Sequence, residues 1–231
     1  LNANAASGYV MYDAAAKTYE LPPEQALALA VENSPVFLPG AFQIISACFN
    51  DEGKIEDAFR QGKGVGWHEN HHDLFRGTER FFRRRYIANL TSSLIPSLAG
   101  VEAKLRTGAK VADIGCGLGS STILMAKAFP KSEFYGFDYH DGSIALAREA
   151  AKREGVDGRL HFEVASAKDF PGKGYDFVAF FDCLHDMGDP AGVAAYVHST
   201  MAGDGTWMIV EPFAEDATEA KPEAPSPQPV A

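Results

Sequence analysis

The stretch that decides the fold is Val111-Ala112-Asp113-Ile114-Gly115-Cys116-Gly117-Leu118-Gly119-Ser120. Its apolar half predicts a buried strand, and its glycines predict a sharp turn into a helix, because glycine tolerates a left-handed backbone and lets a ligand approach closely. Ser120 and Ser121 can cap that helix. Asp138 follows Gly117 by 21 residues, close to the roughly 20-residue spacing of an acidic residue that holds a ribose. The stretch therefore predicts a site for a nucleoside-containing ligand.

Strand and helix patterns alternate around this loop, over residues 108–213. Strands are expected at Lys110–Ile114, Glu133–Phe137, Leu160–Val164, Phe177–Phe181 and Thr206–Glu211. Helices are expected at Ser120–Ala128, Gly142–Arg153 and Ala191–Met201. Such alternation predicts an α/β fold in which a parallel sheet carries helices on both faces.

The rest of the chain has a different character. Residues 8–21 predict a short hairpin, and helices are expected at Gln25–Val31 and Ala41–Phe49. Apolar residues four apart predict a long helix from Glu79 to Leu98. Residues 214–231 are rich in Pro, Ala and Glu and predict a disordered tail.

Composition narrows the class of protein. The 231 residues carry a formal net charge of −10, which disfavours binding to nucleic acid or to an anionic membrane. The chain has three widely spaced cysteines, Cys48, Cys116 and Cys183. Their odd number and wide spacing favour reduced thiols in a cytoplasmic protein over a disulfide framework or a zinc site. Neither a signal peptide nor an apolar run of roughly 18 residues is present. The missing initial Met suggests a fragment or a processed product.

Several interpretations compete for the glycine loop. The dinucleotide fingerprint Gly-x-Gly-x-x-Gly is not met, because the third glycine follows the second by only two residues, and the Gly-Lys-Ser/Thr of a phosphate-binding loop is absent. A plain glycine turn without a ligand is a further alternative. The pattern Asp-x-Gly-x-Gly-x-Gly, which starts at Asp113, resembles the first motif of class I S-adenosylmethionine-dependent methyltransferases, whose sheet is Rossmann-like.

This resemblance implies S-adenosyl-L-methionine as cofactor and a particular set of contacts. The implied cofactor-binding residues are Asp113, Gly115, Gly117, Gly119, Asp138, Ser166 and Asp182. Asp113 would orient the amino group of the methionine part, the glycines would lie under the cofactor, and Asp138 would hold the ribose hydroxyls. Ser166 stands at the adenine-binding position, where related enzymes usually carry Asp.

A candidate general base follows the fourth strand, in Phe181-Asp182-Cys183-Leu184-His185-Asp186-Met187-Gly188-Asp189. This run lacks the Asn/Asp-Pro-Pro-Tyr of N-methyltransferases and resembles small-molecule O-methyltransferases, in which the corresponding His is the general base. The resemblance therefore implies His185 as base and Glu211 as the carboxylate that holds it. A His near neutrality can deprotonate a phenol of pKa about 10. A capping or packed role for His185 is the alternative.

The histidines of residues 67–73 match no zinc signature, so no metal is predicted. A solvated loop is the favoured interpretation, ahead of a lid in which Trp67 and His71 or His72 cover the pocket, and ahead of metal ligation by His68, His71 and His72. The run Arg83-Arg84-Arg85 predicts a solvated helix face.

The wider chain resembles actinobacterial (mycobacterial) methyltransferases that join an N-terminal winged-helix dimerisation domain to a class I catalytic domain. The shared runs are residues 8–21, 73–82 and 180–190. The resemblance implies a partial winged-helix region (1–60), a helical lid and connecting helix (61–107), a cofactor-binding domain (108–213) and the tail (214–231). It also implies a homodimer, and two final antiparallel strands for which this sequence has no counterpart.

Two classes of function follow. The leading hypothesis is a methyltransferase that acts on a small-molecule acceptor, aromatic or hydroxylated, with His185 as base. The alternative is a winged-helix transcriptional regulator whose methyltransferase-like domain senses a ligand, although the net charge of −10 opposes DNA binding. An NAD-dependent dehydrogenase is a third possibility.

Overall fold

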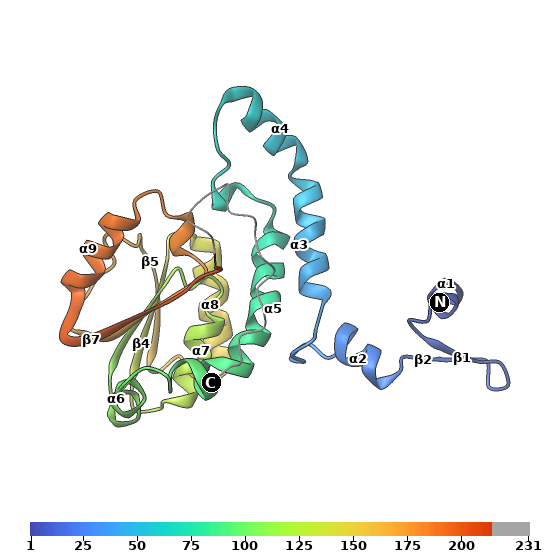
Figure 1. Ribbon diagram of the computed structural model, residues 1–231, viewed down its shortest axis with the longest axis horizontal. Helices are drawn as coiled ribbons and strands as arrows, with labels where there is room; N and C mark the ends of the chain where they lie inside the picture. The colour runs from blue at the N-terminus through green and yellow to red at the C-terminus, as the bar shows by residue number, and fades with distance from the viewer. Residues whose placement is uncertain (214–231) are drawn as a thin grey trace.

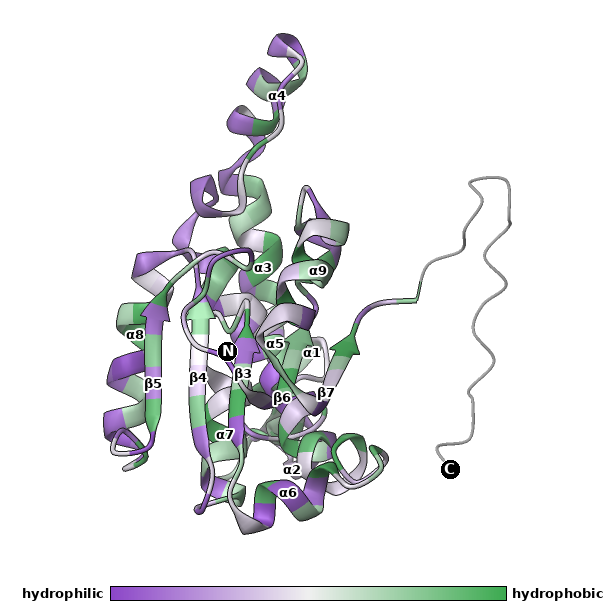
Figure 2. Cartoon of the chain, turned by 90° about the vertical axis from the view of Figure 1, so that its left-hand side faces the viewer, coloured by the Kyte–Doolittle hydropathy of each residue, from purple (hydrophilic) through white to green (hydrophobic). Residues whose placement is uncertain are grey.

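A five-stranded sheet lies at the centre of the computed structural model, which describes residues 1–213. The predicted tail lies outside the described residues. The strands are β3 (Lys110–Ile114), β4 (Glu133–Asp138), β5 (Leu160–Val164), β6 (Tyr175–Phe181) and β7 (Met201–Val210). Their order is β5-β4-β3-β6-β7, every neighbouring pair is parallel, and Figure 2 shows the five in this sequence. The predicted α/β fold with a parallel sheet is therefore confirmed.

Helices cover both faces of this sheet. They are α6 (Val101–Thr107), α7 (Ser120–Ala128), α8 (Asp141–Arg153) and α9 (Pro190–Thr200), with a 3-10 turn η3 (Leu184–Asp186). Neighbouring strand residues point to opposite faces, so Val111 packs in an apolar cluster with α7 and α8, whereas Ala112 packs in a second cluster with α9. The predicted strands and helices of this region are confirmed, but β7 begins at Met201 rather than Thr206. The earlier start coincides with an irregular register opposite Tyr175 and Phe177.

A long helix, α5 (His72–Asn89), crosses beside the sheet and continues into a π-helical turn η2 (Leu90–Leu94). The helix begins seven residues before the predicted start at Glu79, because the Nδ1 atom of His71 accepts a hydrogen bond from the Asp73 N–H and caps its first turn. Leu90 is completely buried against the sheet cluster. This contact fixes the end of α5 on the part of the chain that contains the five-stranded sheet.

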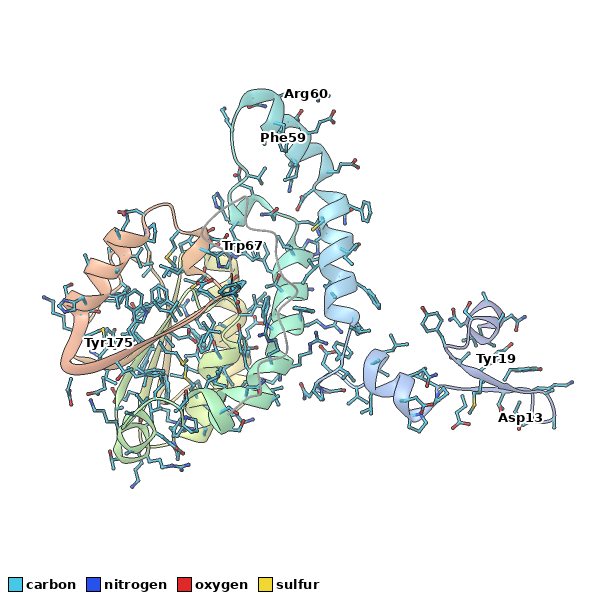
Figure 3. All side chains as sticks on the ribbon, in the orientation of Figure 1. Asp13, Tyr19, Phe59, Arg60, Trp67 and Tyr175 are labelled. Atoms are coloured by element: carbon cyan, nitrogen blue, oxygen red, sulfur yellow. The ribbon has the colours of Figure 1, made fainter. Side chains whose placement is uncertain are left out.

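A second helix, α3 (Pro39–Asn50), runs alongside α5, and α4 (Glu52–Gln61) follows it at the top of Figure 1. Sequence patterns did not predict α4, whose Phe59 side chain is 84% exposed at its tip (Figure 3). The prediction that Arg83-Arg84-Arg85 forms a solvated helix face is wrong for Arg84. Arg80 forms an ion pair with Glu32, and Arg84 lies over the ring of Phe81 and donates to the Phe37 carbonyl oxygen. These contacts connect α5 to residues 32–37.

The N-terminal arm lies away from the sheet (Figure 1). It comprises α1 (Asn2–Ala6), β1 (Met11–Asp13), β2 (Thr18–Glu20) and α2 (Pro23–Leu29). The strands form the predicted antiparallel hairpin, whose turn is closed by N–H groups of Ala15 and Ala16 that donate to Asp13 Oδ1. The winged-helix interpretation of residues 1–60 stays a prediction. Among residues 1–213, no helix has both the length and the apolar character that crossing a membrane requires.

Candidate active site

The loop between β3 and α7 is shaped by its glycines. Gly115, Gly117 and Gly119 all adopt the left-handed backbone, with φ of 68°, 51° and 80°. A Cβ atom on Gly119 would lie 2.4 Å from Cζ of Phe162, whereas a Cβ on Gly117 would meet no atom within 4 Å. Gly119 is therefore required for packing behind the loop, and Gly117 leaves open space in front of it.

Asp113 lies beneath this loop and is 1% exposed. Its Oδ2 atom accepts hydrogen bonds from Ser121 Oγ at 2.6 Å and Thr122 Oγ1 at 2.7 Å. Its Oδ1 atom has no hydrogen-bond partner among residues 1–213. Burial raises the pKa of this carboxyl group to about 6, so Asp113 holds a buried acceptor suited to a donor group of a ligand.

Asp138 is positioned at the end of β4. Its Oδ2 atom accepts the Gly117 N–H at 2.9 Å, and its Oδ1 atom accepts the His140 N–H at 2.9 Å. Burial raises the pKa of Asp138 in spite of these two backbone donors. The carboxylate is thus fixed relative to the glycine loop and keeps lone pairs for a further donor.

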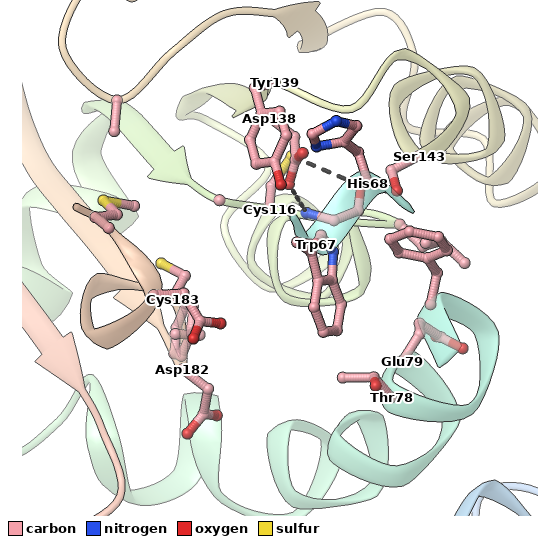
Figure 4. Close-up of a pocket in the computed structure, with 18 of the residues that line it drawn as sticks. Trp67, His68, Thr78, Glu79, Cys116, Asp138, Tyr139, Ser143, Asp182 and Cys183 are labelled. Atoms are coloured by element: carbon pink, nitrogen blue, oxygen red, sulfur yellow. Dashed lines mark hydrogen bonds between the residues drawn. The ribbon is translucent and has the colours of Figure 1, made fainter. Parts of the chain in front are cut away.

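A cavity of about 1010 Å³ opens above the carboxyl ends of the strands (Figure 4), where open parallel sheets bind ligands. Five of the predicted cofactor residues line it: Gly115, Gly117, Asp138, Ser166 and Asp182. Asp113 and Gly119 do not line the cavity and instead support its wall. Figure 4 shows Asp138 and Tyr139 on one side of the cavity and Asp182 with Cys183 on the other.

His185 and Glu211 meet beside this cavity. The Nδ1 atom of His185 shares a hydrogen bond with Glu211 Oε2, and Glu211 Oε1 accepts the Leu184 N–H at 2.7 Å. Neither side chain lines the cavity, but Cys183 and Asp186, which flank His185 in sequence, do. The hydrogen bond to Glu211 raises the pKa of His185. Its side chain is 47% exposed, and Nε2 lies 3.6 Å from Asp186 Oδ1.

The segment before α5 also reaches the cavity. Trp67 and His68, in a 3-10 turn η1 (Trp67–Glu69), line it, whereas His71 and His72 do not. Trp67 packs edge-on against Phe75 with ring centroids 5.2 Å apart. The lid interpretation placed Trp67 at the pocket, where it lies, but it named His71 or His72, neither of which lines the cavity. His71, His72 and Asp73 bring their ligand atoms within 4.8 Å of one another, outside the cavity lining.

Sequence reasoning missed the wall that α5 contributes. The wall consists of Phe75, Thr78, Glu79, Phe82 and Tyr86. Glu79 accepts a hydrogen bond from Ser120 Oγ, which joins α5 to the cofactor-loop helix. The apolar spacing of Phe82 and Tyr86 was visible in the sequence, but such a stripe also marks a helix that packs on a core.

Comparison with known proteins identifies the family. A family model described as a methyltransferase domain matches residues 105–226. The chain belongs to this methyltransferase family. It is 32% identical over 142 residues to 27-O-demethylrifamycin SV methyltransferase of Amycolatopsis mediterranei, a match that covers 61% of this chain and 50% of that protein.

Solved structures share the fold. An O-methyltransferase family protein from Burkholderia thailandensis superposes with a TM-score of 0.68 and 15% identity, over 90% of this chain and 63% of that one. PigF, solved with SAH, gives a TM-score of 0.66 and 18% identity, over 90% of this chain and 64% of that one. The chain thus spans about half to two thirds of the length of these three proteins.

The residues present fit S-adenosylmethionine, the methyl donor of this family. Asp113 and Asp138 place acceptors below and beside the glycine loop, which suits a ligand with an ammonium group and ribose hydroxyls. Residues 113–121 contain no Lys or Arg, so the loop lacks the cation that commonly accompanies a bound phosphate. The family, the fold and the hydrogen-bond acceptors of the loop therefore all agree with S-adenosylmethionine as the cofactor.

Proposed function

We propose that this protein transfers a methyl group from S-adenosylmethionine to a hydroxyl group of a small-molecule acceptor, with His185 as general base. The observation that carries the proposal is the His185–Glu211 pair. It lies at the carboxyl ends of β6 and β7, next to the cavity-lining residues Cys183 and Asp186. The 27-O-methyl chemistry in the name of the Amycolatopsis relative supports the choice of an oxygen acceptor.

The cofactor would be held by the loop and its two carboxylates. Asp113 Oδ1 would accept from the amino group, Asp138 would accept from the ribose hydroxyls, and Ser166 would lie beside the adenine. Gly117, which has open space in front of its Cα atom, would let the backbone approach the ligand. When bound, S-adenosylmethionine supplies a methyl carbon activated by a positively charged sulfur.

The task of His185 would be to remove the acceptor proton. Its Nδ1–H donates to Glu211, which leaves Nε2 as the proton acceptor. Glu211 would also stabilise the imidazolium that forms, and it is itself fixed by the N–H groups of Cys183 and Leu184. Positioning by the cavity would then align the deprotonated oxygen with the methyl group.

The test uses His185→Gln and Glu211→Gln, with turnover measured as release of S-adenosylhomocysteine on the best acceptor from a panel of phenols. Removing a general base is expected to lower kcat roughly 10²- to 10⁴-fold, while calorimetry shows unchanged affinity for S-adenosylhomocysteine.

The pH dependence provides a separate readout. His185 must be neutral to act, so kcat should rise with pH through a pKa above the ordinary 6.5. Glu211→Gln removes the main cause of the raised pKa, so the remaining activity should rise at lower pH than in the wild type. Undiminished turnover in His185→Gln would refute the base role. Failure of the wild type to bind S-adenosylhomocysteine would refute the function itself.

We also propose a homodimer formed through α3 and α4. Phe42, Ile45 and Phe49 fall on one face of α3 and are 56%, 53% and 75% exposed. Phe59 adds an exposed ring on α4, and an apolar face of this kind commonly marks an interface.

A cytosolic location stays a prediction that rests on three free cysteines. No observation favours the ligand-sensing regulator, which the net charge of −10 opposes.

A further inference from the structure

We infer that the acceptor carries a protonated amine, and that Asp182 binds it: the substrate would be a hydroxylated aromatic compound with an ammonium group. The inference rests on the proposed function, since it concerns the acceptor side of the same cavity. It also replaces the cofactor contact that family resemblance implied for Asp182.

The backbone at Asp182 is unusual. Its φ of 49° is left-handed, and among the non-glycine residues of the described chain it shares this feature only with Lys17. The Asp182 N–H donates to the Val210 carbonyl oxygen at 2.8 Å, so β7 holds the strained residue in place. Aspartate adopts this conformation at some energetic cost, and such strain clusters at ligand sites.

The Asp182 carboxylate has few partners. Its side-chain hydrogen bond comes from the Tyr86 hydroxyl at 3.5 Å, which is long for this type of bond. It forms no ion pair of 4 Å or less with any residue of 1–213. Burial raises the pKa of Asp182, and the charge of the exposed Arg85 opposes this rise without cancelling it. Asp182 is thus half-buried on a cavity wall without a strong donor.

Of the other four carboxylates that line the cavity, three have close partners, and the fourth, Asp186, is exposed to solvent. Asp138 accepts two backbone N–H groups, Glu79 accepts the Ser120 hydroxyl, and Asp189 pairs with Lys168 at 3.1 Å. Asp186 lies 3.6 Å from the His185 ring. Lys168 is the only Lys or Arg among the lining residues of the described chain. The cavity wall therefore repels an acceptor carboxylate and attracts an acceptor cation.

Aromatic side chains complete this half of the cavity. Phe82 and Tyr86 stack along α5 with ring centroids 6.5 Å apart, and Tyr86 packs on Phe181 at 5.1 Å. Trp67 projects between this wall and the Asp138 side in Figure 4. Aromatic faces beside a carboxylate are a common arrangement for binding ammonium groups, because the ring faces carry partial negative charge.

The experiment compares three catechols that differ only in the terminal group of one side chain. Dopamine, 3,4-dihydroxyphenethyl alcohol and 3,4-dihydroxyphenylacetic acid are titrated into protein saturated with S-adenosylhomocysteine. Dopamine is expected to bind roughly 10- to 100-fold more tightly than the acid, as a charge-assisted hydrogen bond would give. Asp182→Asn should remove most of the preference for dopamine and leave binding of the alcohol unchanged. Asp204→Asn, which changes the same charge at the opposite end of β7, should leave all three affinities unchanged.

The outcomes separate this inference from the proposed function. Absence of dopamine binding, equal binding of the three catechols or tighter binding of the acid would overturn the inference, while retained affinity for S-adenosylhomocysteine leaves the methyltransferase proposal standing. Loss of that affinity in Asp182→Asn would assign the residue to the cofactor and would also overturn it. Asn tolerates the left-handed backbone as Asp does, so the variant should fold.

Discussion

Two glycines of the loop, Gly119 and Gly117, should respond differently to alanine: the first mainly through stability, the second mainly through cofactor binding. At Gly119 a Cβ atom would lie 2.4 Å from Cζ and 2.9 Å from Cε1 of Phe162, and 3.1 Å from Cβ of Ala147. The Phe162 ring cannot withdraw, because it is 4% exposed and also fills the space beside Gly136. At Gly117 the same atom would enter open space.

The energies follow from these contacts. A left-handed backbone costs about 1–2 kcal/mol for a residue with a Cβ atom, and both variants incur this cost. Overpacking adds about 1–3 kcal/mol for Gly119→Ala only. We therefore expect Gly119→Ala to lower the free energy of unfolding by about 2–5 kcal/mol and Gly117→Ala by about 1–2 kcal/mol. Gly117→Ala should instead weaken cofactor binding by about tenfold or more, which corresponds to ~1.4 kcal/mol.

Urea unfolding of the ligand-free protein and calorimetry with S-adenosylhomocysteine measure the two effects separately. Gly53→Ala is the control. Gly53 lies within α4, no atom lies near its Cβ position, and alanine accepts its backbone conformation. The unfolding free energy of this variant should stay constant or rise by about 0.5–1 kcal/mol. Equal destabilisation by Gly119→Ala and Gly117→Ala, or wild-type cofactor affinity in Gly117→Ala, would refute the reasoning.

Two further predictions concern a buried charge and an exposed surface. Because burial raises the pKa of Asp113 to about 6 in the folded state, the folded protein binds a proton more tightly there, and stability should fall as pH rises from about 4 to 6. Asp113→Asn should then raise the unfolding free energy of the ligand-free protein at pH 7 by up to ~3 kcal/mol, and it should lower the affinity for the cofactor. If the variant unfolds with the same pH dependence as the wild type, the buried charge of Asp113 is not the cause. Sedimentation should show a dimer that Phe42→Ser with Phe49→Ser converts to a monomer, whereas Leu146→Ser, at an exposed position of α8, should leave it intact. A monomeric wild type would exclude the interface.

The sequence predicts the cofactor half of the molecule well because its signals are local. Lys110–Ile114, Ser120–Ala128 and Leu160–Val164 occur at the predicted bounds. Apolar runs define the strands, and the glycine turn fixes where the helix starts. The link between Asp138 and the loop also follows from spacing, since parallel strands bring their carboxyl ends to one edge.

The cavity wall that α5 contributes depends on contacts between residues far apart in the sequence, and local sequence patterns do not predict such contacts. Glu79 and Ser120 are 41 residues apart and meet only because α5 crosses beside α7. The start of α5 depends on a histidine cap, which is less usual than Ser or Asp. Tyr86 lies on an apolar stripe that serves both packing and the cavity, so periodicity alone could not assign it to a ligand.

The position of α5 itself depends on α3. A Cβ atom on Gly77 would lie 2.8 Å from the Ile44 backbone nitrogen, and one on Gly40 would lie 2.7 Å from the Phe81 nitrogen. The two helices therefore approach as closely as glycine allows, and a shift of α3 must move α5. Such a shift moves the cavity wall that α5 contributes, and Glu79 passes part of it to Ser120 at the start of α7. Gly115 and Cys116 are held separately, because their N–H groups donate to the Phe137 carbonyl oxygen of β4. The exposed apolar face of α3 lies on this same helix, so the proposed dimer contact would stabilise the geometry of the acceptor side in particular.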